Sequence, residues 1–294
     1  MRVLTGVSLA VVMALSNLLL AGCETVPQGR DLAGVSQAAS LSDAPLVGAP
    51  SGRTAAEDDP GRSEGMLRLA ADLEGRGEKG TALTFYERAA TASNGDIATY
   101  MKVGDAFLRL DYPINAANAY RFVLTKDPEN GGALLGLGSA LARNGDIEQG
   151  LAYLAKAAPA VNTASAYHRL GLAHVMAGQP REALASFEQA HAMDAKDIDI
   201  STNLAIAASL AGQHDKAVDL MKAVAKRSDA GPEHKRNLVL VMGIAGKGAD
   251  AKAGVTDLPP ETVALLLEQA TRIRAMSSAK ARALALGTAS SSTQ

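Results

Sequence analysis

The chain has 294 residues, with 29 Lys and Arg against 31 Asp and Glu, so its formal net charge is −2 at pH 7. This mildly acidic balance lacks the positive surface that nucleic-acid binding requires, and we expect no nucleic-acid partner. Aromatic residues make up only 3% of the chain and Trp is absent, which leaves Ala, Leu, Val and Met to build a core of closely packed helices.

The first 22 residues are typical of a secretory signal peptide. Arg2 precedes an apolar stretch from Val3 to Leu20, and small residues follow it, as in a basic region, an apolar region and a cleavage site. The sequence Leu20-Ala21-Gly22-Cys23 resembles the bacterial lipobox, and Cys23 is the only cysteine. The resemblance implies cleavage after Gly22 and lipidation of Cys23. The alternative is an uncleaved membrane anchor, since the apolar stretch nearly spans a bilayer.

A lipidated Cys23 would attach the protein to a membrane without a transmembrane helix, because several acyl chains together anchor stably. Glu24 follows Cys23, whereas Asp at this place is the usual inner-membrane retention signal of enteric lipoproteins. We therefore expect the periplasmic face of the outer membrane of a Gram-negative bacterium. Residues 23–62 are dominated by Gly, Ala, Ser, Pro, Asp and Gln, which predicts a flexible tether.

From Ser63 onward the sequence repeats itself every 33 or 34 residues. One register comprises Ala70, Gly104, Gly138, Gly171, Ala205 and Val239. A second register of small residues comprises Ala82, Ala116, Gly150, Ala183 and Ala217. The pattern resembles the tetratricopeptide repeat, a unit of two paired helices. The resemblance implies an all-α superhelical solenoid over residues 63–246, with five full repeats and a partial sixth.

Residues 247–286 are expected to form a linker and one C-terminal capping helix. Pro260 and Glu261 suit the first turn of a helix. The apolar residues that follow at helical spacing are Val263, Leu266, Leu267, Ala270 and Ile273. A solenoid needs such a helix to cover its last apolar face. The Ser-rich residues 287–294 are expected to be disordered.

No group of residues in the sequence predicts catalysis or metal binding. The five histidines are dispersed, and His168 and His174 do not have the spacing that puts two metal ligands on one helix face. Gly246-Lys247-Gly248 lacks the Ser or Thr of a phosphate-binding loop. We therefore expect no enzymatic activity, no cofactor, no metal and no small-molecule substrate.

The remaining candidate is a surface. In the repeat that this chain resembles, the inner side of each first helix lines a groove. Mostly apolar residues stand there, which predicts a groove for an apolar or amphipathic segment of a partner protein; the alternative is that they pack between repeats. The candidates are Leu67, Met101, Leu108, Leu135, His168, Leu172, Met176, Ile206 and Leu240.

The end of the chain resembles a more specific family. It reads Arg236-Asn237-Leu238-Val239-Leu240-Val241-Met242-Gly243, and then Asp257-Leu258-Pro259-Pro260-Glu261. Together with the lipobox, the tether and the repeats, these segments are similar to the TadD family, the repeat-containing lipoproteins of the Tad (Flp pilus) assembly apparatus. The resemblance implies a non-enzymatic, pilotin-like role with the secretin or other Tad components as partners. A general lipoprotein scaffold for outer-membrane or cell-wall assembly is the alternative.

Overall fold

A computed structural model describes residues 60–291, and this part of the chain is helical without any strand. The signal peptide, Cys23 and most of the predicted tether lie outside the described residues. Five antiparallel helix pairs come first, as the repeats predicted. They are α1 (Pro60–Gly75) with α2 (Lys79–Ala92), α3 (Ile97–Leu110) with α4 (Pro113–Lys126), α5 (Gly131–Asn144) with α6 (Ile147–Val161), α7 (Ala164–Ala177) with α8 (Pro180–Met193), and α9 (Ile198–Leu210) with α10 (His214–Ala225).

Side-chain caps set the start of the first helix in the second to fifth pairs. Each cap accepts a hydrogen bond from a backbone N–H of the first helical turn, which satisfies a group that has no partner inside the helix. The caps are Asp96, Asn130, Thr163 and Asp197. These polar residues therefore determine where each of the four helices begins, and the apolar pattern determines which side of the helix is buried.

A residue with positive φ closes the turn inside each pair. Glycine occupies this place in most pairs, because it adopts a left-handed backbone without steric cost. The second pair has Asp111 instead, at φ 69°. Asp is one of the few other residues that enter this region, and here its carboxylate also accepts a hydrogen bond from Arg143 Nη2 at 2.7 Å.

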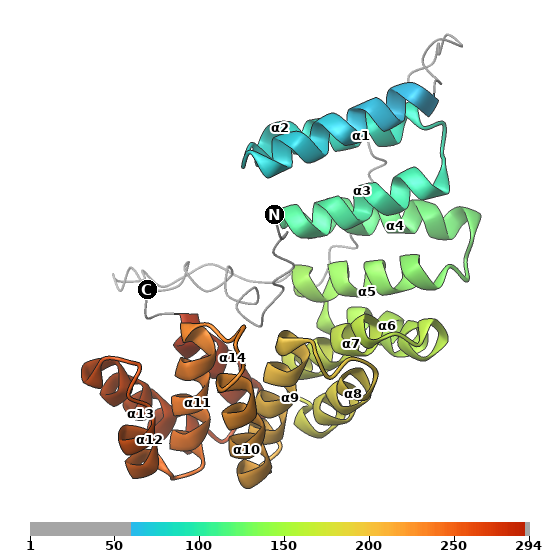
Figure 1. Ribbon diagram of the computed structural model, residues 1–294. Helices are drawn as coiled ribbons and strands as arrows, with labels where there is room; N and C mark the ends of the chain where they lie inside the picture. Colours follow the sequence, from blue (N-terminus) through green and yellow to red (C-terminus); the bar gives the residue numbers. More distant parts are fainter. Residues whose placement is uncertain (1–59, 292–294) are drawn as a thin grey trace, which may run out of the picture.

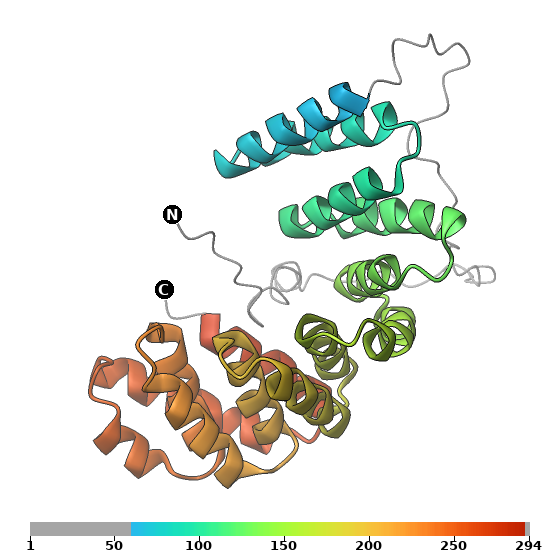
Figure 2. The ribbon, with the colours of Figure 1, turned by 45° about the vertical axis from the view of Figure 1, so that its right-hand side comes forward.

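The helix pairs stack in chain order and the stack curves, as the two ribbon views show (Figures 1 and 2). Successive first helices contact one another, namely α1 with α3, α3 with α5, α5 with α7, and α9 with α11 (Pro232–Ile244). These helices line the inner side of the curve, which we call the concave face, and the second helices lie outside. The first helices are thus the elements that a bound segment would meet.

The C-terminal end differs from the expected single capping helix. After α11 come α12 (Gly248–Gly254), α13 (Pro260–Ala275) and α14 (Ala279–Ser291). Because α12 has only seven residues, α13 packs directly on α11, and a Cβ on Gly243 would lie 2.6 Å from Ala270 Cβ.

Two boundaries also differ from the predicted ones. Helix α14 continues through residues 287–291, where we expected disorder, because Ala283, Leu286 and Gly287 give it a buried side. Helix α1 begins at Pro60, inside the predicted tether, since proline suits the first position of a helix.

Candidate partner-binding face

The last helix of the chain lies against the concave face. Helix α14 contacts α7, α9 and α11, all of them first helices, and the ribbon views place it beside them (Figures 1 and 2). Its first turn reaches the end of α7, where a Cβ on Gly178 would lie 2.9 Å from Lys280 Cβ. Leu286 is only 1% exposed and joins the core formed by the second half of the solenoid. The protein therefore covers part of its own concave face.

The predicted groove residues of this second half belong largely to the core. Ile206 is buried and Leu240 has no exposed surface at all, and both lie in the same hydrophobic cluster as Leu286. Leu172 is half-buried against this cluster, and Met176 is also partly exposed. The prediction that Ile206 and Leu240 offer contact surface is thus wrong for this arrangement, because packing between repeats and against the C-terminal helices covers them.

The first half of the concave face is also only partly open. Leu108 and Leu135 are buried in the cores of the first three repeats and of α5 to α7, so they do not form the predicted contact surface either. Leu67 and Met101, on α1 and α3, remain half-exposed at the edge of the first core. In this half of the concave face, these two are the predicted groove residues that are left for a partner.

His168 makes a structural contact between two repeats. Its Nε2 lies 2.7 Å from Nδ2 of Asn203 on α9, and its ring centroid is 5.6 Å from that of Phe187. Burial lowers the pKa of His168, with Asp197 acting against this effect and Arg169 adding to it. The neutral ring accepts the hydrogen bond from the amide, so the group that we predicted as a groove residue joins α7 to α9.

A polar network that sequence reasoning missed links the first two repeats on the concave side. Arg109 Nε and Nη2 donate to the Glu74 carboxylate at 2.9 and 3.1 Å, and the Tyr86 hydroxyl donates to the same carboxylate at 2.7 Å. Burial by itself raises the pKa of Glu74, but the hydrogen bonds from Arg109 and Tyr86 outweigh it and lower the pKa. Glu74 and Arg109 lie 35 residues apart in sequence, so no local motif connects them.

Arg143 repeats this arrangement one unit later. Its Nη1 donates to the Leu108 carbonyl at 2.7 Å, and its Nη2 bonds to Asp111. Beside these pairs, Asp105 is exposed on α3 and accepts a hydrogen bond from the Tyr120 hydroxyl at 2.6 Å. The open part of the concave face therefore combines two apolar side chains with charges of both signs, which suits an amphipathic segment.

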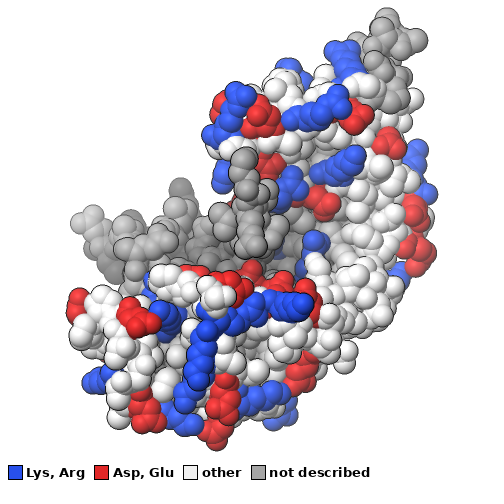
Figure 3. Space-filling view, viewed as in Figure 1, with Lys and Arg blue, Asp and Glu red and all other residues white. Residues whose placement is uncertain are grey.

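The charge pattern of the surface agrees with this description. Charged side chains of both signs are interspersed over α1 to α4 and over the C-terminal helices, while the surface over α5 to α7 is mostly uncharged (Figure 3). Between residues 60 and 291, no three His, Cys, Asp or Glu side chains gather as metal ligands do. In the same range, every helix is too short or too polar to cross a membrane.

Two family models described as tetratricopeptide repeat match the sequence, one over residues 131–196 and the other over residues 174–236. Among curated proteins there is no significant match. Several solved structures have a similar fold. A tetratricopeptide repeat protein from Parabacteroides merdae has a TM-score of 0.56 at 16% identity, and the alignment covers 80% of this chain and 94% of that one.

Two further solved structures show the same likeness. The pilF protein of Pseudomonas aeruginosa has a TM-score of 0.53 at 15% identity and covers 67% of this chain and 90% of its own. A thermophilic protein of this repeat class from Thermus thermophilus has a TM-score of 0.50 at 22% identity, covering 61% and 98%. At such identities the likeness concerns the fold alone. The fold is a tetratricopeptide-repeat solenoid, a class that serves protein–protein interaction, as the sequence predicted.

Proposed function

We propose that this protein is a non-enzymatic lipoprotein of the Tad (Flp) pilus assembly apparatus, anchored through Cys23 on the periplasmic face of the outer membrane. In this role it binds a segment of the secretin on its concave face and supports secretin assembly, as a pilotin does. The Tad assignment rests on the sequence resemblance of the lipobox, the repeats and the segment Asp257–Glu261 to the TadD family. The binding mode rests on the structure.

The observation that carries the binding mode is the position of α14. A helix with one buried side, formed by Ala283 and Leu286, contacts three first helices. A surface that packs a helix of the same chain has the shape and the apolar character that a partner helix requires. Since α14 occupies part of the fourth to sixth repeats, we assign the partner to the first three, where Leu67 and Met101 are half-exposed.

The anchor and the solenoid have separate tasks in this proposal. Lipidation at Cys23 would fix one end of the chain to the membrane. Residues between Cys23 and α1 would then let the solenoid reach a partner above the membrane surface, because their composition favours a flexible chain. The secretin would be held near the membrane into which it inserts.

The test is co-purification of the secretin with charged variants of the solenoid. Met101→Glu and Leu67→Glu should each abolish association and piliation, because the contact would desolvate an unpaired charge. Ile114→Glu is the matched control, since Ile114 is 54% exposed on α4, a second helix outside the concave face. Circular dichroism checks that all three variants fold. If the Met101→Glu and Leu67→Glu variants fold and still bind the secretin, the binding mode is contradicted. If the wild-type protein binds another envelope protein instead of the secretin, the Tad assignment is contradicted.

A further inference from the structure

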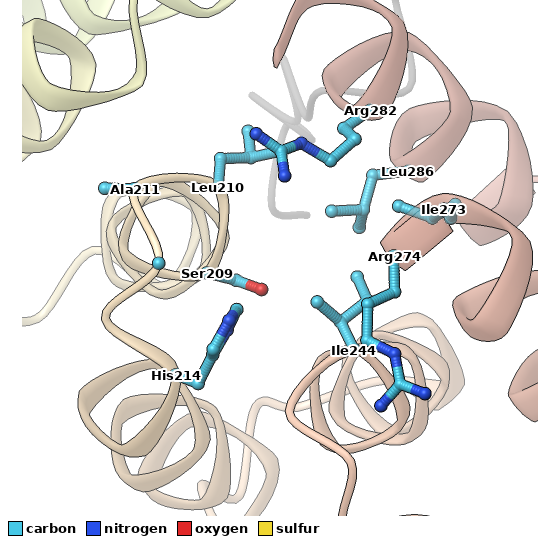
Figure 4. A pocket seen from close by; sticks show the side chains of 10 residues that line it. Ser209, Leu210, Ala211, His214, Ile244, Ile273, Arg274, Arg282 and Leu286 are labelled. Carbon is cyan, nitrogen blue, oxygen red and sulfur yellow. The ribbon is translucent and has the colours of Figure 1, made fainter. Parts of the chain in front are cut away.

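A pocket lies where α14 meets the solenoid. Its volume is about 180 Å³, and helices α9, α10, α11, α13 and α14 all contribute to it. Its apolar walls include Leu210, Ile244 and Leu286, and its polar groups are Ser209, His214, Arg274 and Arg282. Figure 4 shows the Ser209 hydroxyl, the His214 ring and the Arg282 guanidinium directed at the same space from three sides.

Three polar atoms at this pocket are buried without a hydrogen-bond partner among the described residues. They are Ser209 Oγ, His214 Nδ1 and Arg282 Nε. Ser209 is only 3% exposed, so bulk water does not satisfy its hydroxyl. Buried polar groups in folded proteins are nearly always hydrogen-bonded, and three such atoms in one pocket therefore indicate a bound group.

The charge of the pocket identifies the kind of group. Neither Arg274 nor Arg282 has an ion pair within residues 60–291, and none of the residues that line the pocket there is acidic. By contrast, Arg272, on the same helix as Arg274, pairs with Glu268. A water molecule would satisfy the hydroxyl and the ring but would leave the positive charge uncompensated. An anion would accept hydrogen bonds from these polar groups and would also compensate the positive charge.

We propose that Ser209, His214 and Arg282 form a binding site for an oxyanion, a carboxylate or a phosphate group. The planar guanidinium of Arg282 offers two parallel N–H donors, which match the paired oxygens of either group. The hydroxyl of Ser209 and Nδ1 of His214 supply further donors. Arg274 also lines the pocket, but its guanidinium turns away from these three groups and its Nη1 lies next to the turn at Gly246, so Arg282 is the cation that faces the site.

The site is complete only when α14 is docked. Arg282 and Leu286 come from α14, whereas Ser209 and His214 belong to the fifth repeat. A ligand that binds the docked arrangement better than the open one shifts the equilibrium toward it. The anion therefore holds α14 on the concave face, and its loss frees this part of the face. This inference does not depend on the Tad assignment.

Hydrogen exchange of the full chain tests the site directly. Sodium phosphate and sodium acetate are titrated separately, with sodium chloride keeping the ionic strength constant, and amide exchange is followed in residues 279–291. The anion must leave before α14 can undock. When the concentration of the free anion is ten times its dissociation constant, exchange in α14 should therefore slow about tenfold. A response to phosphate alone would identify a phosphate site, a response to acetate alone a carboxylate site, and a response to both a general oxyanion site.

Variants separate the site from general salt effects. Arg282→Gln and Ser209→Ala should each abolish or weaken the response, and Arg282→Lys should retain part of it because the charge remains. Arg272→Gln is the matched control, since Arg272 is exposed on α13 and paired within its own helix. The proposal is overturned if neither anion slows exchange in α14 beyond chloride. It is also overturned if Arg282→Gln and Ser209→Ala, shown to be folded by circular dichroism, respond like the wild type.

Discussion

Gly138 of α5 and Gly150 of α6 lie backbone against backbone. A Cβ on Gly138 would stand 2.8 Å from the carbonyl oxygen of Gly150, and a Cβ on Gly150 would stand 2.6 Å from that of Gly138. In both directions the obstacle is main chain, which cannot rotate out of the way as a flexible side chain does. The absence of side chains at these two positions is therefore what allows the pair to pack so closely.

Gly138→Ala should accordingly destabilise the protein by about 1–3 kcal/mol, because the two helices have to move apart. Gly65→Ala is the matched control. Gly65 lies inside α1 with open space around the place of a Cβ, so alanine should stabilise by about 0.5–1 kcal/mol through helix propensity. Urea unfolding followed by circular dichroism measures both. Equal effects in the two variants would show that close packing is not the role of Gly138.

Stability should depend on pH through His168. Burial lowers the pKa of this ring in the folded chain, whereas an unfolded histidine titrates at about 6.5. Since the folded pKa is the lower one, the stabilising contribution is complete above about pH 6.5 and is lost as the pH falls from there toward the folded pKa. His168→Gln keeps an acceptor for Asn203 but does not titrate, so it should lose less stability than the wild type between pH 7 and 5. Urea unfolding at both pH values checks this, and an unchanged pH dependence would contradict it.

Cys23 is expected to carry the lipid and to form the N-terminus of the mature protein. Mass spectrometry of the protein from its native membrane should find an acylated Cys23. Cys23→Ser should give an uncleaved or unanchored form whose helix content is unchanged, because the described helices of the solenoid all lie within residues 60–291, away from Cys23 in the sequence. A mature N-terminus at another residue, without a lipid, would contradict the lipobox.

The repeats could be predicted because the residues that recur with the repeat period contact one another within a helix pair. Small residues recur at fixed spacing, and the structure places Gly138 and Gly150 backbone against backbone between α5 and α6, while Gly104 and Gly171 each face an aromatic ring of the paired helix. The C-terminal helices follow no such period. Helix α14 is mostly Ala, Lys, Arg and Ser with one strongly buried Leu, and the Ser-rich composition of residues 287–294 suggested that its end is disordered. The contacts that stabilise this helix involve first helices of three repeats.

The candidate site was predictable only in outline. The repeat pattern predicted which side of each first helix faces inward, but not how much of each side chain the neighbouring repeats cover. Leu135 and Leu240 stand at inward-facing positions and are nevertheless buried, whereas Met101 remains half-exposed. The pocket around Arg282 was out of reach, because its polar groups come from segments that the fold alone brings together.

The most direct test of the partner-binding face is site-specific photo-crosslinking in cells that assemble Tad pili. A photoreactive amino acid is placed at Met101 on the concave face and, as the control, at Ile114 on α4. We expect a crosslink between position 101 and the secretin, and none from position 114. A secretin crosslink from position 114 alone, or from neither position while piliation is intact, would contradict the claim that the first three repeats hold the secretin on their concave face.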